Sequence, residues 1–264
     1  MENSILSKCL STYSPISLDE MESVKLMNRV DTKFVCHESL LPSILSQAEE
    51  GYTVQEVAGK RIATYDTVYY DTSGLDMYLR HHDQQLVRRK VRVRTYVDTG
   101  SVFLEIKKKN NRGRTKKKRI AIQVENRKSP DLCAQRLEGD RLLTEFVAKH
   151  TPYEWSELAP KERTSFERVT LVNKGKTERL TIDFNLRFEA IGSGVKADLG
   201  PLVIIELKRD GLVPSRMQHI LRDLRIFPMK ISKYCMGVTM TIPEVKHNRF
   251  KEKLIKLNKL RYYA

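Results

Sequence analysis

Apolar and polar residues alternate along several stretches of the chain, and this period of two predicts β-strands. Short Asn-, Asp- and Gly-containing segments separate many of these stretches, as in turns between antiparallel strands. The predicted strands span residues 29–36, 63–70, 85–97, 102–109, 117–125, 165–172, 178–188 and 202–208. The pattern therefore predicts a fold dominated by an antiparallel sheet.

Helices are predicted between and around these strands. Pro42 suits the first turn of a helix that runs to about Glu50. Further helices are predicted over residues 20–27, 130–149 and 214–225, and a basic one over the last 19 residues. The chain has no internal repeat and no Pro- or Gly-rich linker. We therefore expect an α+β fold with one domain over residues 1–245 and a basic helical tail over residues 246–264.

Charge and cysteine content narrow the class of protein. The 264 residues include 48 Lys and Arg against 33 Asp and Glu, a formal net charge of +15, which indicates phosphate-rich ligands, anionic membranes or nucleic acid as partners. Cys9, Cys36, Cys133 and Cys235 are isolated from one another, so we expect reduced core thiols in a cytoplasmic protein. We find neither a signal peptide nor an apolar run near the roughly 20 residues that span a bilayer.

Basic residues recur on one face of the predicted strands. The polar faces carry Arg88, Lys90, Arg92 and Arg94; Glu105, Lys107 and Lys109; Arg179, Asp183, Asn185 and Arg187; and Glu206 with Lys208. Each strand alone fits a half-exposed sheet with a solvated face. The recurrence favours a barrel whose polar faces line a tunnel. Because a tunnel of like charges is costly unless an anion fills it, we expect a triphosphate-like ligand and a divalent metal held by carboxylates.

Eight short motifs occur in the order found in the VTC domain, the catalytic domain of the vacuolar transporter chaperone polyphosphate polymerases and their bacterial relatives. They are RVDTKF (29–34), TVYYDT (67–72), KVRVRTY (90–96), FLEIKKK (103–109), ERTSF (162–166), RLTIDFNL (179–186), VIIELK (203–208) and ISKYCMG (231–237). From about residue 25 to 240 the chain resembles this family, which belongs to the triphosphate tunnel metalloenzymes. It is similar to the standalone bacterial type, without the SPX domain of the yeast enzymes.

The resemblance implies an antiparallel β-barrel tunnel surrounded by helices. It also implies an ATP-dependent polyphosphate polymerase that uses Mn²⁺ or Mg²⁺. Carried over motif by motif, the catalytic phosphate-gripping residues would be Lys33, Arg92, Arg94, Lys107, Arg163, Arg179 and Lys233. Further substrate contacts are expected from Arg29, Lys90, Lys118, Arg119 and Lys208, with Lys117 as an alternative in its basic run. Glu206 would hold the metal, and Glu105 and Asp31 would be either further metal ligands or ion-pair partners of the cations.

Phosphoryl transfer requires positioning and charge neutralisation more than covalent chemistry, so no phospho-enzyme is expected. The expected partners are ATP and polyphosphate. Two alternatives stay open: a triphosphate hydrolase of the same fold, and a non-catalytic polyanion-binding module. Nucleic acid is disfavoured, because the basic residues share strand faces with carboxylates. The tip of the hairpin near residue 112 either is solvated or guides polyphosphate, and the tail either docks on the domain or contacts an anionic membrane.

Overall fold

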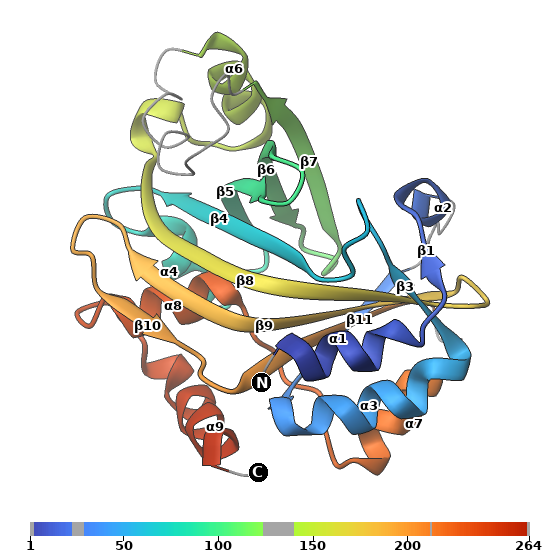
Figure 1. The fold of residues 1–264 in the computed structure, drawn as a ribbon. Coiled ribbons are helices and arrows are strands. Elements are labelled where there is room, and N and C mark those ends of the chain that lie inside the picture. Colours follow the sequence, from blue (N-terminus) through green and yellow to red (C-terminus); the bar gives the residue numbers. More distant parts are fainter. Residues whose placement is uncertain (1–2, 23–28, 124–139, 212, 263–264) are drawn as a thin grey trace.

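The computed structural model describes residues 3–22, 29–123, 140–211 and 213–262 (Figure 1). Within them one sheet of 11 strands follows the main path β2-β11-β9-β8-β4-β5-β6-β7, in which all neighbours are antiparallel. The path consists of β2 (Arg29–His37), β4 (Ala63–Asp71), β5 (Arg88–Tyr96), β6 (Ser101–Lys109), β7 (Thr115–Ile122), β8 (Ala159–Asn173), β9 (Glu178–Ala190) and β11 (Leu202–Asp210). The short strands β1 (Pro15–Ile16), β3 (Tyr52–Gln55) and β10 (Lys196–Asp198) pair beside it. The predicted α+β class with a dominant antiparallel sheet is confirmed.

The sheet curls so that one face is concave (Figure 1). Long strands twist, and bulges add local bends where β4 meets β8 at Tyr69/Tyr70 and where β8 meets β9 at Ser165/Glu167. In the described part of the chain, β2 and β7 end the path and do not pair with each other. The sheet is thus a tunnel-like trough that is open along one line.

Helices cover the convex face in two places. α1 (Asn3–Ser11), α3 (Leu41–Ala48) and α7 (Arg216–Asp223) pack on β2, β11, β9 and β8. α6 (Arg141–His150) packs on β5, β6 and β7. The apolar residues of the predicted strands point into these two layers, for example Leu180 and Ile182 into the first and Val91 and Leu104 into the second.

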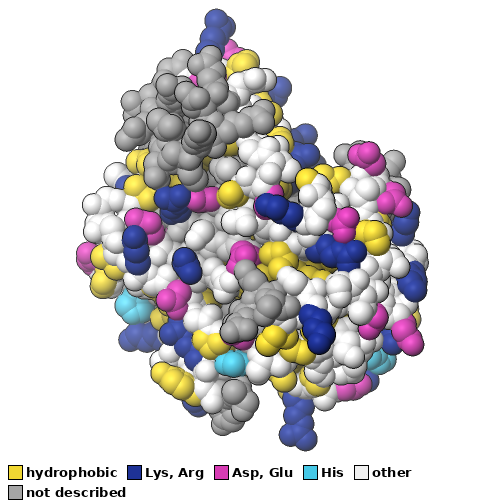
Figure 2. All heavy atoms as spheres, viewed as in Figure 1, with side chains coloured by type: hydrophobic (Ala, Val, Ile, Leu, Met, Phe, Trp, Pro, Cys, Tyr) yellow, Lys and Arg dark blue, Asp and Glu magenta, His cyan; other side chains and the backbone are white. Residues whose placement is uncertain are grey.

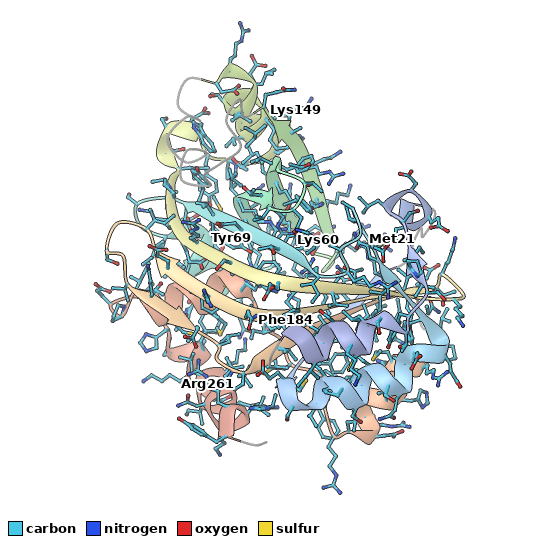
Figure 3. All side chains as sticks on the ribbon, viewed as in Figure 1. Met21, Lys60, Tyr69, Lys149, Phe184 and Arg261 are labelled. Atoms are coloured by element: carbon cyan, nitrogen blue, oxygen red, sulfur yellow. The ribbon has the colours of Figure 1, made fainter. Side chains whose placement is uncertain are left out.

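A third apolar core lies on the concave side. α4 (Asp76–His82), α8 (Lys233–Thr241) and α9 (Lys251–Tyr262) pack there against Tyr65, Tyr69 and Phe166 of the sheet. Figure 3 labels Tyr69 on β4, in this core, and Phe184 on β9, which belongs to the convex core beneath α1. One end of the concave face is therefore filled with helices, and its polar side chains lie beside them.

The helix predictions are confirmed in part. α3 and α7 match the expected helices. The tail docks through Phe250, just before α9, and Leu257 of α9, both of which are buried. α2 (Leu18–Glu22) and α6 overlap the helices expected over 20–27 and 130–149, whose remaining residues fall largely in 23–28 and 124–139, outside the described residues. α1, α4 and α8 were not predicted. α8 has no polar stripe to give a helical period, because nearly all of its residues are buried.

The predicted faces of β9 are wrong beyond Phe184. Asn185 adopts a left-handed backbone conformation (φ 51°), and the pairing with β8 shifts at the same place. A bulge of this kind adds one residue and reverses the alternation. Leu186 and Phe188 consequently join the concave core, and Arg187 is exposed on the other side.

Cysteines in the described part of the chain form no disulfide. Cys9, Cys36 and Cys235 are free thiols, two of them buried, and Cys133 lies outside the described residues. Among the helices of the described ranges, none combines the length and apolarity needed to cross a membrane.

Candidate active site

The concave face gathers basic side chains from many strands. On the face seen in Figure 2, by contrast, Lys and Arg are scattered among acidic and uncharged side chains. The strand registers place Lys33 opposite Glu206, Arg168 opposite Asp183, and Arg92 opposite Glu105. The concave cations of the sheet are Lys33, Arg88, Lys90, Arg92, Arg94, Lys107, Lys109, Lys117, Arg119, Arg168, Arg179 and Lys208, and α8 adds Lys233.

Charged side chains from opposite walls of the trough interact with one another. Lys107 lies on β6, and its pKa is held well below its usual value by Arg92, by burial and by Arg94. Glu206 and Lys208, on β11 at the far side of the sheet path, also act on Lys107. Arg168 acts on Arg94 on one side and on Glu206 on the other. Residues from both halves of the curled sheet therefore surround one space.

Asp183 holds two of these cations. Its carboxylate accepts hydrogen bonds from Arg168 at 2.5 Å (Nε) and 2.7 Å (Nη2), and it forms an ion pair with Lys233. Burial alone would raise the pKa of Asp183, but the two cations hold it well below its usual value. Asp183 is therefore ionised and fixes both side chains across the trough.

Two stacked aromatic rings contact the same two cations, Arg168 and Lys233. Tyr65 and Phe166 lie parallel with centroids 5.1 Å apart. The Arg168 guanidinium lies 5.0 Å from the Tyr65 centroid, and Lys233 Nζ lies 4.6 Å from that of Phe166. Cation–π contacts of this kind hold a charge in place without neutralising it, so the cations stay available to an anion.

Glu105 organises the other wall. It is fully buried and accepts from Arg92 at 2.5–2.8 Å and from Lys117 at 2.9 Å, with a different oxygen for each partner. Arg92, Arg94 and Lys117 together overcome the effect of burial and keep the pKa of Glu105 well below normal. Both oxygens are engaged, so Glu105 is an ion-pair partner of the cations.

Helix α8 closes one side of this space. Ser232 caps the helix and its hydroxyl accepts a hydrogen bond from Lys90 at 2.6 Å. The carbonyl of Ile231 accepts from Lys33 at 3.1 Å. One helix start thus orients lysines from two separate strands and adds Lys233 of its own.

Several cations have no carboxylate in contact. Within the described part of the chain, Lys107 has no hydrogen-bond or ion-pair partner, and Arg94 reaches only the Thr67 hydroxyl, at 3.3 Å, and neighbouring rings. Burial lowers the pKa of Lys90, Lys208 and Lys233 to about 8 in each case. Carboxylates on this face include Asp31, Glu105, Asp183 and Glu206, with Glu162 beneath α8 and Asp210 at the end of β11. Cations therefore outnumber carboxylates, and the site can accept a multiply charged anion.

The VTC domain family matches residues 28–242. The chain belongs to this family. Among curated proteins none is similar enough to count as a match.

Three solved structures show a distant similarity to this VTC domain. The Hippeastrum protein HpAC1, described as revealing a dominant triphosphatase activity, is 16% identical over 80% of this chain and 95% of its own, with a TM-score of 0.45. PH1012 from Pyrococcus horikoshii is 11% identical over 78% of this chain and 98% of its own, with a TM-score of 0.40. A conserved hypothetical protein from Pyrococcus furiosus is 11% identical over 78% of this chain and 99% of its own, with a TM-score of 0.38.

Most residues expected from the resemblance meet on the concave face of the VTC domain. Lys33, Arg92, Arg94, Lys107, Arg179 and Lys233 converge there, with Lys90, Lys208 and Glu206. Arg119 lies opposite Glu105 in the β6–β7 ladder, with its guanidinium 4.6 Å from the Phe103 ring. Arg29 begins β2, and its side chain is outside the described part of the structure.

Two expected residues lie elsewhere. Arg163 stands opposite Val68, on the convex side, and donates to Asp66 at 2.6–2.9 Å. Lys118 stands opposite Ile106, on the same convex side, and is exposed. The expectation that Arg163 and Lys118 line the trough is therefore wrong. Side chains alternate along a strand, and in both cases the two flanking residues are the ones that point into the trough.

Arg168 was missed by the sequence reasoning. The alternation Glu162, Thr164, Phe166, Arg168 along β8 contains the signal. The ERTSF motif drew attention to Arg163 instead, although Arg163 has the opposite parity. The stacked pair of Tyr65 and Phe166 was also missed, because nothing local distinguishes supporting rings from ordinary core rings.

Protein ligands for a divalent metal are few on the described part of the concave face. Within the described ranges, no three His, Cys, Asp or Glu side chains gather as a metal cluster. Glu206 pairs with Lys208 at 3.6 Å, a longer contact than those of Glu105 and Asp183 with their arginines, and a fifth of its side chain is exposed. Mg²⁺ binds through one or two carboxylates plus substrate phosphates. The donor set therefore fits a metal that arrives with a phosphate ligand.

Proposed function

We propose that this VTC domain is a polyphosphate polymerase that transfers the γ-phosphate of ATP to a growing polyphosphate chain. The observation that carries the proposal is the convergence of cations from both walls on one space, with Lys107 acted on by residues of β5 and of β11. A triphosphate presents several negative charges along a short line, which suits such an arrangement. Family membership over residues 28–242 supports the same substrate class.

The reaction needs the two phosphate chains aligned end to end. Arg168 and Arg92 are held by Asp183 and Glu105, so their positions are set before substrate binds. Arginine can bind two phosphate oxygens at once, whereas Lys107 and Lys90 act as point charges. We propose that the terminal phosphate of the acceptor attacks the γ-phosphorus in line and that ADP leaves, while these side chains neutralise the charge.

Glu206 is the residue that would hold Mn²⁺ or Mg²⁺ beside the phosphates. A bound divalent ion supplies additional neutralisation of the phosphate oxygens. Burial alone would raise the pKa of Glu206, but Lys208, Lys33, Lys107 and Arg168 hold it well below its usual value. The carboxylate therefore stays ionised and can bind a cation.

The products of ATP turnover test the proposal. Purified protein incubated with ATP and Mn²⁺ is expected to form ADP and long-chain polyphosphate, resolved on a polyacrylamide gel. ADP with free phosphate alone would indicate the triphosphate hydrolase instead. No turnover together with tight polyphosphate binding would indicate a binding module.

Replacing Glu206 by Gln tests the metal assignment. We expect metal-dependent turnover to fall roughly 100-fold or more, since metal-borne charge stabilisation is worth several kcal/mol. The exposed Glu244, in the turn after α8, gives the matched control Glu244→Gln, whose turnover should equal that of the wild type. Equal activity of Glu206→Gln and Glu244→Gln would remove Glu206 from the site.

A further inference from the structure

A ladder of like charges continues past the candidate active site along β5 and β6. Lys90 stands opposite Lys107, and the next concave pair is Arg88 opposite Lys109. Like charges directly opposite each other destabilise a sheet. Glu105, the carboxylate of these two strands, lies two concave positions inward from Lys109 and is already engaged by Arg92 and Lys117. The outer pair therefore has no carboxylate beside it on β5 or β6.

The C-terminal helix brings another cation to the same end. Phe250 packs edge-on against Tyr78 and His82 of α4, with centroids 5.9 and 5.3 Å away. The backbone N–H of Arg249 donates to His82 Nε2 at 3.3 Å. These contacts fix the start of α9, and Lys253 lies one turn further on, with Nζ 5.1 Å from the Phe250 centroid.

The cations of the ladder and of α9 act on one another. Burial lowers the pKa of Lys109, and Arg88 and Lys230 lower it further. Burial also lowers the pKa of Lys253, with Lys230 and Arg88 contributing in the same direction. Contacts place these elements together, since Lys90 of β5 donates to Ser232 at 2.6 Å and Phe250, before α9, lies 6.5 Å from the His81 ring. β5, β6, α9 and the segment before α8 thus direct charges of one sign at a common region.

His81 of α4 adds no positive charge there. Burial and the neighbouring cations, Lys90 first among them, lower its pKa to about 2, so the ring is neutral. Its Nδ1 is buried and, among the described residues, has no hydrogen-bond partner. The region is therefore lined by four cations and a neutral imidazole.

The position and chemistry of this region favour a phosphate chain. It continues from Lys90 and Lys107 of the candidate active site, and successive concave positions on a strand are about 7 Å apart. A linear polyphosphate can follow such a row without a break. Single-stranded nucleic acid would need aromatic rings for its bases to stack on, but the concave positions at this end of β5 and β6 are occupied by Arg88, Lys90, Lys107 and Lys109.

We propose that Arg88, Lys109, Lys230 and Lys253 form a second anion site that holds the polyphosphate segment beyond the triphosphate and so selects long chains over short ones. The proposal rests on the polyphosphate-related function proposed above. It gives the C-terminal helix, which lies beyond the family-matched residues 28–242, a direct part in substrate binding.

Equilibrium binding tests this site without any need for turnover. The double variant Lys109→Ala/Lys253→Ala is compared with wild type and with Lys259→Ala, an exposed lysine of the same helix, by calorimetric titration with long-chain polyphosphate and with tripolyphosphate. A basic residue near a polyanionic surface contributes about fivefold in affinity. We expect the double variant to bind long chains about 20-fold more weakly and tripolyphosphate within about twofold of wild type.

Three results would overturn the second site. Unchanged long-chain affinity would show that these lysines do not touch the ligand, and equal losses for both ligands would place them at the triphosphate site. A single-stranded RNA that binds wild type as tightly as long-chain polyphosphate and loses affinity in parallel would indicate a nucleic-acid surface. Failure of the polymerase proposal is seen separately, as absence of polymer from ATP with the length-selective binding intact.

Discussion

Single residues on the concave face fall into two groups with different tasks. Arg168 and Arg92 are tied to the buried carboxylates of Asp183 and Glu105, which fixes their geometry. Lys90 and Lys107 touch no carboxylate in the described part of the chain. The first group preorganises the site, and the second supplies charge that only a ligand can neutralise.

The depressed lysine pKa values predict a pH dependence of binding. Lys90, Lys208 and Lys233 have a pKa of about 8, below the model-compound value of 10.5. Their charge is present below pH 8 and is lost as the pH rises through it. At pH 9 each is charged in only about one molecule in ten, so we expect tripolyphosphate affinity to fall at least about tenfold between pH 7 and 9, with proton uptake on binding.

Calorimetry in buffers of different ionisation enthalpy measures that proton uptake directly. Lys208→Arg is the matched control, because arginine stays charged throughout this range, and its affinity should fall less steeply. Equal affinity of the wild type at pH 7 and pH 9, without proton uptake, would show that the three lysines do not contact the ligand.

At the scale of elements, the position of α8 sets the site. Its residue Gly237 faces the fully buried Glu162 of β8. A Cβ added at Gly237 would lie 2.4 Å from Glu162 Oε1 and 2.9 Å from its Cγ. Burial raises the pKa of Glu162 well above normal, and its carboxyl accepts from Thr164. The side chain has no solvent to move into, so this close approach requires glycine.

Gly237→Ala is expected to push α8 away from β8. Overpacking of this kind costs about 1–3 kcal/mol, which outweighs the roughly 1 kcal/mol that alanine adds as a helix former. We also expect weaker tripolyphosphate binding, because Ser232 and Lys233 move with the helix. Urea unfolding and calorimetric titration measure the two effects.

Gly74 provides the control for this substitution, since a Cβ there meets nothing within 4 Å. Gly74→Ala should keep wild-type stability and affinity. If Gly237→Ala were as stable and bound as tightly as Gly74→Ala, the packing of α8 on Glu162 would not position the lysines.

Elements with one apolar face were predictable from the sequence, and the others were not. The strands of the main path were found because their alternation records a convex core, as Leu104 and Ile106 do on β6. α8 was not predicted, because it is buried on nearly all sides and so shows no alternation of apolar and polar residues. The bulge at Asn185 was not predicted, because a single left-handed residue leaves no periodic signal in the sequence. The residues of β9 beyond it were therefore assigned to the wrong faces of the sheet.

At the scale of the whole molecule, the curl of the sheet makes the site. β6 and β11 are far apart along the sheet path, yet Lys107 and Glu206 act on each other. The net charge of +15 predicted an anionic partner but not where it binds. Which cations share a space depends on closure between distant strands, which a strand's own alternation does not record.

Neighbouring lysines on β6 allow the most direct test of whether the concave face binds the phosphate chain. Lys107 points into the trough, and Lys108, the next residue, lies on the convex side and is exposed. Tripolyphosphate binding is measured by calorimetry for Lys107→Ala and Lys108→Ala, which remove the same charge. Because a hydrogen bond to a charged group is worth about 1.5–3 kcal/mol, we predict at least about a tenfold loss for Lys107→Ala and less than twofold for Lys108→Ala. Equal losses, or a larger loss for Lys108→Ala, would contradict binding in the trough.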